Sequence, residues 1–287
     1  TAAAPVIGDD GTIYIAGEYP GEPTGGGLRN SGLMAISPSG SMKWFFHARE
    51  DAGNSIATYY GESAALGRDG TVYFSWWDST FYALKPDGTV KWKRSQICNR
   101  DCCPPLMGPA IGSDGNIYAG SDTIMCLRPD GYVVWRFYAD TLGFCQRIIL
   151  GKNLIFCSFQ GKGILALDYS GHIKWLYSAY IVNPRRAGII ADEDDNIYFK
   201  TNSSNLVSVS STGQLRWRNG GGLSEPALRG DYLYFLYSGY LYRLDKNTGT
   251  GDTILAAMPL DFTDTTSPLI DDNGTIYIVS RFFPSLG

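Results

Sequence analysis

Short segments in which apolar and polar residues alternate recur along the whole chain, each beginning at a turn that contains glycine. Residues Ile7–Ile15 read IGDDGTIYI, and the phrase returns as LGRDGTVYF at Leu66–Phe74 and as IGSDGNIYA at Ile111–Ala119. Asp-Gly is typical of tight hairpin turns, because glycine readily adopts a positive φ. Strict alternation on either side of such a turn indicates half-buried strands. The pattern therefore predicts repeated antiparallel β-hairpins.

The aromatic residue at the centre of this phrase marks seven copies. It is Tyr14, Tyr73, Tyr118, Phe156, Tyr198, Tyr234 and Tyr277. In five copies a second phrase follows, in which a Trp stands four residues after a turn glycine. These pairs are Gly40–Trp44, Gly88–Trp92, Gly131–Trp135, Gly171–Trp175 and Gly213–Trp217. The sixth copy keeps Gly249 but has Thr253 in place of the Trp.

Each pair of phrases predicts four short strands, which form one small sheet. Such a sheet cannot bury both faces by itself, and four-stranded units of about 40 to 45 residues are typical of propeller blades, including WD40-like ones. We therefore expect an all-β fold, a β-propeller of four-stranded antiparallel blades, with seven blades of which the last is incomplete; six or eight blades are the alternatives. The chain, 1–287, is expected to form a single propeller domain. The expected blades are approximately residues 1–50, 62–100, 108–140, 147–180, 187–220, 225–260 and the partial 267–287.

The two phrases, Pro-x-Ile-Gly-x-Asp-Gly-x-Ile-Tyr and Leu-x-Pro-Asp-Gly-x-x-x-Trp-x-Phe, resemble the quinoprotein-type (PQQ-like) β-propeller repeat over almost the whole chain. That family includes quinoprotein dehydrogenases, a lipoprotein that helps to assemble outer-membrane barrels, sensor domains and surface proteins without a cofactor. The resemblance implies the fold, whereas the function has to be argued from the site. Quinoprotein alcohol dehydrogenases carry a vicinal disulfide above the quinone, which is what the resemblance implies as one alternative for Cys102 and Cys103.

Charge and composition exclude several classes of protein. The 24 Lys and Arg residues against 28 Asp and Glu residues give a net charge of −4, which excludes a strongly basic surface for nucleic acid. Apolar runs are far shorter than the roughly 18 residues of a membrane-spanning helix, so no membrane span is expected. Gly-rich, aromatic-rich composition fits many short strands joined by tight turns.

Connections of unequal length indicate which end of the sheets carries recognition residues. The turns between first and second strands and between third and fourth strands are short, whereas several connections at the opposite end are long, and binding residues concentrate in long loops on rigid scaffolds. We expect a site for a protein partner or a glycan at this long-loop face. Its candidate residues are Tyr19, Arg29, Tyr59, Tyr60, Trp76, Trp77, Asp78, Arg100, Arg185 and Arg186. A Trp could stack on a sugar or instead pack between blades, and the Arg pair could hold an anion or simply be solvated.

The six cysteines suggest disulfide bonds and therefore an oxidising compartment. The expected pairing joins Cys98 to Cys102 or Cys103 within one loop and uses the other to tie a neighbouring blade, for example through Cys145. Cys126 and Cys157 fall at strand positions and are expected to be buried thiols. The start Thr1–Pro5 also reads like a mature terminus, so we expect an extracytoplasmic protein, whether secreted, periplasmic or on the cell surface.

No catalytic or metal-ligating set emerges from the remaining residues. The two histidines, His47 and His172, stand far apart, which leaves a Ser-His-Asp relay and a His-ligated zinc site unsupported. The acidic turn Asp192–Asn196 lacks the loop spacing of an EF-hand, so a solvated hairpin turn is favoured over a calcium site.

Three functions remain open from the sequence. We favour a non-enzymatic interaction or scaffold propeller without a cofactor. The alternatives are a dehydrogenase that depends on pyrroloquinoline quinone (PQQ) and calcium, which the resemblance implies, and a structural subunit that docks through the edge of its incomplete blade.

Overall fold

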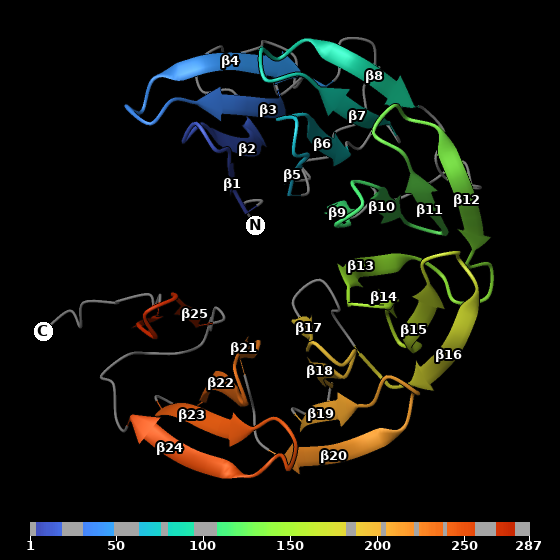
Figure 1. The fold of residues 1–287 in the computed structure, drawn as a ribbon, viewed down its shortest axis with the longest axis vertical. Coiled ribbons are helices and arrows are strands. Elements are labelled where there is room, and N and C mark those ends of the chain that lie inside the picture. The colour runs from blue at the N-terminus through green and yellow to red at the C-terminus, as the bar shows by residue number, and fades with distance from the viewer. Residues whose placement is uncertain are drawn as a thin grey trace, which may run out of the picture. The chain divides into compact units, whose positions relative to one another are not determined.

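The computed structural model describes residues 4–18, 31–48, 63–75, 80–94, 108–181, 188–201, 205–220, 224–237, 240–255 and 268–278 (Figure 1). All regular elements in these segments are β-strands, arranged in seven antiparallel sheets. Among the described residues no helix is long and apolar enough to span a membrane. The chain divides into two compact units, Thr1–Ile148 and Ile149–Gly287. The expectation of a single domain stays a prediction.

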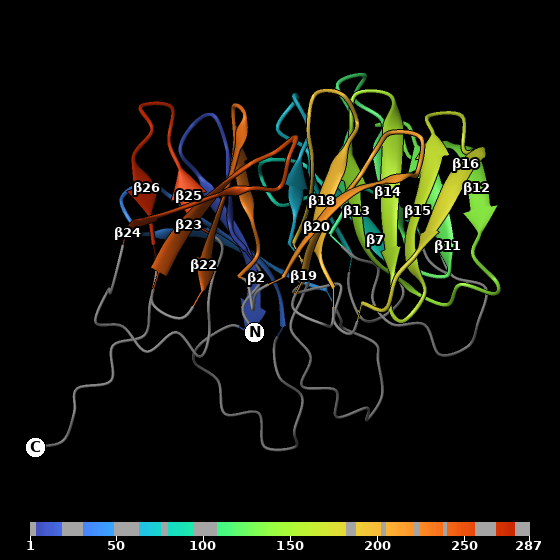
Figure 2. The same ribbon diagram turned by 90° about the horizontal axis from the view of Figure 1, so that it is seen from below.

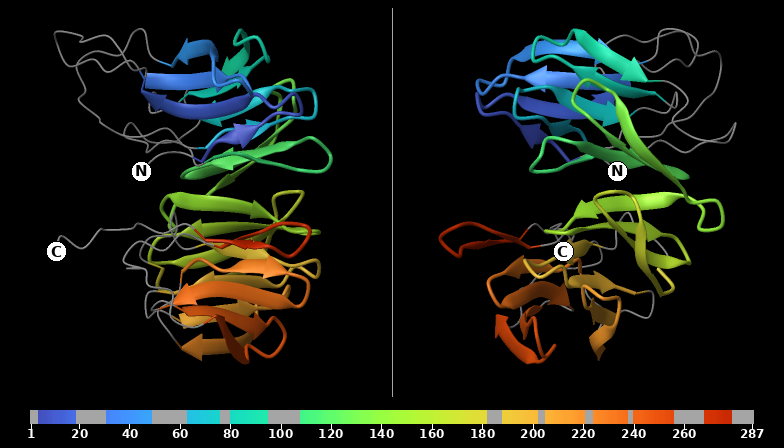
Figure 3. Two further views of the ribbon diagram at one scale, coloured as in Figure 1. Left: turned by 90° about the vertical axis from the view of Figure 1, so that its left-hand side faces the viewer. Right: turned by 45° about the vertical axis from the view of Figure 1, so that its right-hand side comes forward.

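The first unit contains three four-stranded sheets in which strands follow the order of the chain. The first is β1 (Val6–Ile7), β2 (Ile13–Glu18), β3 (Ser31–Ile36) and β4 (Met42–His47). The second is β5 (Ala65–Leu66), β6 (Val72–Ser75), β7 (Phe81–Leu84) and β8 (Val90–Arg94). The third is β9 (Ala110–Ile111), β10 (Ile117–Gly120), β11 (Thr123–Leu127) and β12 (Val133–Tyr138). Figure 3 shows the four strands of the first sheet, in blue, side by side.

The second unit repeats this pattern and ends with a shorter sheet. Strand β13 (Cys145–Leu150), which begins in the first unit, pairs in a sheet with β14 (Leu154–Phe159), β15 (Gly163–Asp168) and β16 (Ile173–Ser178). The next sheets are β17 (Ile189–Ala191), β18 (Ile197–Lys200), β19 (Asn205–Val209) and β20 (Leu215–Gly220), then β21 (Ala227–Arg229), β22 (Tyr232–Tyr237), β23 (Tyr240–Asp245) and β24 (Gly251–Leu255). The last sheet has two described strands, β25 (Leu269–Ile270) and β26 (Ile276–Tyr277).

Inner strands such as β6, β10 and β14 are buried on both faces because consecutive sheets pack against each other. In β6, Val72 and Phe74 join a cluster with Leu33 of the first sheet, whereas Tyr73 joins a cluster with Ile117 of the third. Alternate side chains of a strand point to opposite faces, so one short strand serves two cores. Burying one such side chain contributes about 1.5–3 kcal/mol. Tyr73, which belongs to the recurring aromatic position of the sequence, therefore lies in the interior. The same holds for Tyr14, Tyr118 and Tyr198.

The two ends of the sheets differ as the sequence predicts. In a four-stranded meander the first and third turns lie at one end, which we call the short-turn end; its turns are short, such as the one between Ile7 and Ile13. At the opposite end the connections are longer, as between His47 and Ala65 and between Arg94 and Ala110. Figure 2 shows the turns β17–β18 and β25–β26 projecting on the same side of the second unit.

In four of the outer strands, β4, β8, β16 and β20, a Trp contacts the third turn of the next sheet. In the first unit the Trp44 indole Nε1 donates a hydrogen bond of 2.8 Å to the carbonyl of Pro86, and Trp92 Nε1 donates one of the same length to Pro129. In the second unit Trp175 donates to Ser211, and Trp217 donates to Lys246. We call this arrangement the Trp–turn contact. It gives the recurring Trp a structural role.

The glycine of the third turn is required for two separate reasons. Gly88 has a φ of +86°, and a Cβ built on it would lie 2.8 Å from Cδ2 of Trp44. Gly131 has the same relation to Trp92, and Gly249 to Trp217. Gly40 has a similar φ of +85°, but nothing lies within 4 Å of its Cβ position. Gly40 is therefore required only because of its positive φ.

The last sheets depart from the repeat. Thr253 of β24 occupies the position of the Trp and pairs with Tyr242 of β23. In the two-stranded sheet Tyr277, at the position of the buried tyrosines, is 54% exposed. Within the described residues, this two-stranded sheet agrees with the prediction that the last of seven blades is incomplete.

Gly88→Ala is expected to destabilise the protein more than Gly40→Ala. Both variants place an alanine at positive φ, which costs about 1–2 kcal/mol. Only Gly88→Ala also pushes a methyl group against Trp44, which adds about 1–3 kcal/mol of overpacking. Urea unfolding followed by Trp fluorescence measures both. Equal free energies of unfolding for the two variants would show that the Trp–turn contact tolerates the methyl group.

Candidate binding surfaces

The ten ligand-binding residues predicted from the sequence lie outside the described residues. They are Tyr19, Arg29, Tyr59, Tyr60, Trp76, Trp77, Asp78, Arg100, Arg185 and Arg186. Their grouping at the long-loop face stays a prediction, and so does the loop disulfide among Cys98, Cys102 and Cys103, which also lie outside.

The cysteines within the described residues are thiols. Cys126, Cys145 and Cys157 are all buried, as expected for the first and third. Cys145 differs from the expectation, because the structure contains no inter-blade disulfide at this residue: its Sγ donates to the carbonyl of Arg147, at 3.3 Å, in its own strand β13. Burial raises the pKa of the Cys126 thiol, which makes that group less reactive.

No metal-binding group of three or more His, Cys, Asp or Glu side chains occurs among the described residues. His172 is exposed in its turn and lies 3.5 Å from Asp168, whereas His47 packs against the ring of Phe45.

Aspartates of the first turn tie that turn to the outer strand. Asp69 accepts hydrogen bonds from the Lys91 ammonium, at 2.8 Å, and from the backbone N–H of Thr71. These bonds, the one from Lys91 foremost, lower the pKa of Asp69 to about 2, against the opposing effect of burial. The first sheet repeats the arrangement with Asp10 and Lys43.

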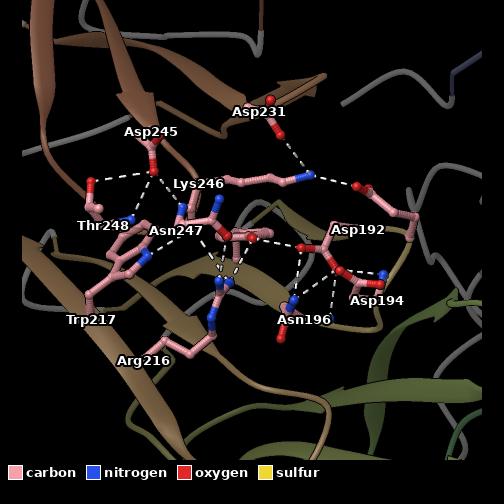
Figure 4. Close-up of polar contacts among 12 residues, drawn as sticks. Asp192, Asp194, Asn196, Arg216, Trp217, Asp231, Asp245, Lys246, Asn247 and Thr248 are labelled. Carbon is pink, nitrogen blue, oxygen red and sulfur yellow. Dashed lines mark hydrogen bonds and ion pairs between the residues drawn. The ribbon is translucent and has the colours of Figure 1, made fainter.

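In the second unit a denser polar network joins two consecutive sheets (Figure 4). Asp192, in the turn from β17 to β18, accepts a hydrogen bond of 2.8 Å from the Tyr198 hydroxyl. That hydroxyl in turn accepts one of 2.8 Å from Arg216 of β20. The guanidinium of Arg216 also reaches Oδ1 of Asn247 in the next sheet, at 2.8 Å. Burial and the bond to Asp192 together raise the pKa of Tyr198, so that its hydroxyl keeps its proton.

The acidic turn uses its own carboxylate internally. Oδ1 of Asp192 accepts from the backbone N–H groups of Asp194 and Asn196, and Oδ2 accepts from Tyr198 and from Nδ2 of Asn196. Burial opposes ionisation, but these donors together lower the pKa of Asp192. Both oxygens are therefore occupied by the hairpin and its neighbours, which supports the interpretation as a turn rather than a calcium site.

Lys246 completes the network between the two sheets. Its side chain is only 6% exposed, and its ammonium lies 2.6 Å from Glu193 and 3.4 Å from Asp231. The carboxylates, Glu193 first, raise the pKa of Lys246. The backbone carbonyl of the same residue accepts the Trp217 indole N–H. The cluster therefore holds sheets together and offers no group poised for catalysis.

Two open hollows lie on the first unit, both at the short-turn end. The first, of about 430 Å³, is lined by Asp69, Thr71, Lys85, Pro86, Asp87 and Lys91. Two cations face two carboxylates, and we call it the balanced hollow. The second, of about 350 Å³, is lined by Trp92, Lys93, Arg94, Arg128, Asp130, Gly131 and Tyr132. Three cations face one carboxylate, and we call it the basic hollow.

The basic hollow was not predicted from the sequence. It lies at the short-turn end, whereas the lengths of the connections indicated a site at the opposite end. Arg94 of β8 donates from Nη2 to the carbonyl of Gly131, at 2.6 Å. Arg128 lies 4.6 Å from the centroid of the Tyr132 ring and 3.0 Å from Asp130. The pair Lys93-Arg94, directly after the Trp, was the sequence feature that could have indicated this hollow. The residues that complete it, Arg128 to Tyr132, belong to the next sheet and are distant in the sequence.

Comparisons with known proteins agree with the repeat architecture. A family model described as outer membrane protein assembly factor BamB matches residues 77–221. BamB from Moraxella catarrhalis, known from a crystal structure, is 15% identical to this chain in sequence. The two structures match with a TM-score of 0.68, and the match covers 97% of this chain and 79% of that chain. A crystal structure of the computationally designed Ika8 protein is 10% identical, with a TM-score of 0.68 over 98% of this chain and 83% of that one. No curated protein matches the chain. The fold is a β-propeller, as predicted.

Tyr198→Phe is expected to lower the free energy of unfolding by about 1–3 kcal/mol, because it leaves the buried Asp192 and the half-buried Arg216 without their shared partner. Tyr277→Phe is the matched control, since Tyr277 makes the equivalent bond to Asp271, at 3.2 Å, on an exposed turn. The control should change stability by less than about 0.5 kcal/mol. Similar losses in the two variants, measured by urea unfolding, would contradict a special role of the network.

The stabilising effect of Asp69 should depend on pH. Because its pKa is lowered from 3.8 to about 2 in the folded protein, its contribution is present above pH 4 and is lost as the pH falls towards 2. The group is exposed, so Asp69→Asn should cost no more than about 1 kcal/mol at pH 7, and the difference should shrink by pH 3. Unfolding at both pH values measures it; a constant difference would contradict the assigned ionisation.

Proposed function

Because the chain belongs to the PQQ-like repeat family of β-propellers, whose matching model is described as outer membrane protein assembly factor BamB, we propose that it is a non-enzymatic scaffold that binds a protein partner outside the cytosol. The extracytoplasmic location rests on this family membership. It does not rest on the described cysteines, which are thiols.

The solvent face of the outer strand β12 is the observation that carries the proposal. Val134 and Tyr138 are 48% and 55% exposed, and Tyr132, just before the strand, is 59% exposed. Aromatic side chains that remain exposed on a rigid surface are typical of the centres of protein interfaces. Their position on the edge strand of the third sheet places them beside unpaired backbone groups, which favour pairing with another extended segment.

The other outer strands that contain the Trp carry a cation at the position before it. The residue before the Trp is Lys43 in β4, Lys91 in β8, Lys174 in β16 and Arg216 in β20, whereas β12 has Val134. Lysine on an edge strand discourages edge-to-edge association. In the third sheet Val134 stands where the first two sheets have the lysine that pairs with the turn aspartate. The aspartate of this sheet, Asp114, instead accepts a hydrogen bond from Asn116 in its own turn. The valine therefore costs the sheet an ion pair and supplies an exposed apolar side chain, which with Tyr138 flanks Arg136 on the same face and supports a binding role.

The two alternative functions differ in their support. Among the described residues no observation supports the dehydrogenase. Docking through the incomplete blade has one supporting observation, because Leu269 and Tyr277 of the two-stranded sheet are exposed. This surface is the second candidate.

Site-specific photo-crosslinking in producing cells tests the proposal. A photoreactive residue is placed at Tyr138 on β12, at Tyr277 on β26, and, as a control, at Leu215 on β20, which is also exposed. We expect one discrete protein adduct from Tyr138, found outside the cytosol, and none from Leu215. An adduct from Tyr277 alone would favour the second candidate, and no adduct from either position, or the same adducts from all three, would overturn both.

A further inference from the structure

We propose that the basic hollow, lined by Trp92, Lys93, Arg94, Arg128 and Tyr132, binds the carboxylates of an acidic segment of the protein partner, an inference that rests on the proposed scaffold function. The hollow lies directly before β12, because Tyr132 lines it and Val133 begins the strand. A segment that follows the exposed face of β12 would therefore reach the hollow without leaving the surface.

Local charge in the hollow is opposite to that of the whole chain. Lys93, Arg94 and Arg128 face the single carboxylate of Asp130, while the protein carries a net charge of −4. The balanced hollow on the same unit has two cations and two carboxylates, so its charges are equal in number. The excess in the basic hollow is left for a ligand.

Two of the cations are held in place before any ligand arrives. Arg94 donates from both Nε and Nη2 to the carbonyl of Gly131, at 3.2 and 2.6 Å. Arg128 is fixed by its contact with the Tyr132 ring and by Asp130. Nη1 of Arg94 and Nζ of Lys93 have no hydrogen-bond partner in the described segments. Ordered cations with donors to spare bind carboxylates at a reduced entropic cost.

The positive charge of Arg94 is not needed for the fold. In the fifth sheet the equivalent residue, two positions after the Trp, is Asn219, and its Nδ2 donates to the carbonyl of Gly249 at 2.8 Å. A neutral amide thus makes the same bond to the same turn. An arginine at this position adds a cation that packing alone does not require.

Aromatic walls and one acidic residue favour a peptide over other anions. Trp92 and Tyr132 line the hollow beside the cations, so an apolar side chain next to a carboxylate finds a surface of its own. Asp130 opposes a doubly charged phosphate more than a single carboxylate. A nucleic acid would in addition meet the negative charge of the whole protein.

Fluorescence anisotropy with a labelled six-residue peptide that alternates Asp and Tyr tests this inference on the intact protein. We expect saturable binding that weakens with added salt, and no binding of the same peptide with Asn in place of Asp. The double variant Lys93→Gln with Arg128→Gln should bind at least about fivefold more weakly, since it removes two of the three cations. Lys85→Gln, which removes an exposed cation from the balanced hollow, is the matched control and should bind as the wild type does.

Each opposite result would overturn the inference. Equal affinity in the double variant and the wild type, with unchanged circular dichroism, would place the peptide elsewhere. Tighter binding of inorganic phosphate or of phosphatidylglycerol vesicles, lost in the same double variant, would assign the hollow to a phosphate or a membrane. The crosslink from Tyr138 is scored separately, so an adduct there without peptide binding would leave the scaffold standing and remove only the acidic segment.

Discussion

The contact between an outer-strand Trp and the glycine turn of the following sheet is the constraint on which the rest of each unit depends. A small meander with two apolar faces is not stable alone, so it must be held against its neighbour in one register. The indole holds the two sheets together in two ways. Its ring packs on the turn glycine, and its N–H donates to a turn carbonyl, as Trp92 does with Gly131 and Pro129. In the sixth sheet Thr253 replaces the Trp, and the sheet that follows has only two described strands.

This constraint also decides where chemistry is available. Inner strands such as β6 are buried on both faces, and the aspartates of the first turns, such as Asp69, are bonded within their own sheet. The polar network around Tyr198 and Lys246 likewise joins sheets. Among the described residues, the surfaces left for binding are the outer strands and the short turns that pack beside them, as in the basic hollow. Recognition at such a surface is the function that we propose.

Most of the fold was predictable because its determinants are local and repeated. The Asp-Gly turns, the alternation around Tyr73 and the spacing from Gly88 to Trp92 are each readable within a few residues. Features that depend on which sheet packs beside which were not readable in this way. Cys145 was expected in a disulfide but is a buried thiol bonded to Arg147, because one cysteine does not reveal its spatial neighbours. The basic hollow was missed for the same reason, since β8 and the turn before β12 meet only after the sheets have packed.

The Trp–turn contact and the proposed binding site are therefore parts of one geometry. Once Trp92 is seated on Gly131, the two residues that follow it on β8 must lie beside the turn that contains Arg128 and Asp130. In the fifth sheet the second of these residues, Asn219, only supports the turn, whereas Arg94 supports it and adds a charge. Changing the residues that follow each Trp thus alters the surface between two sheets without disturbing the contact that joins them. A repeat of this kind can acquire a recognition site at one junction while the others remain structural, which is the arrangement that the first unit presents.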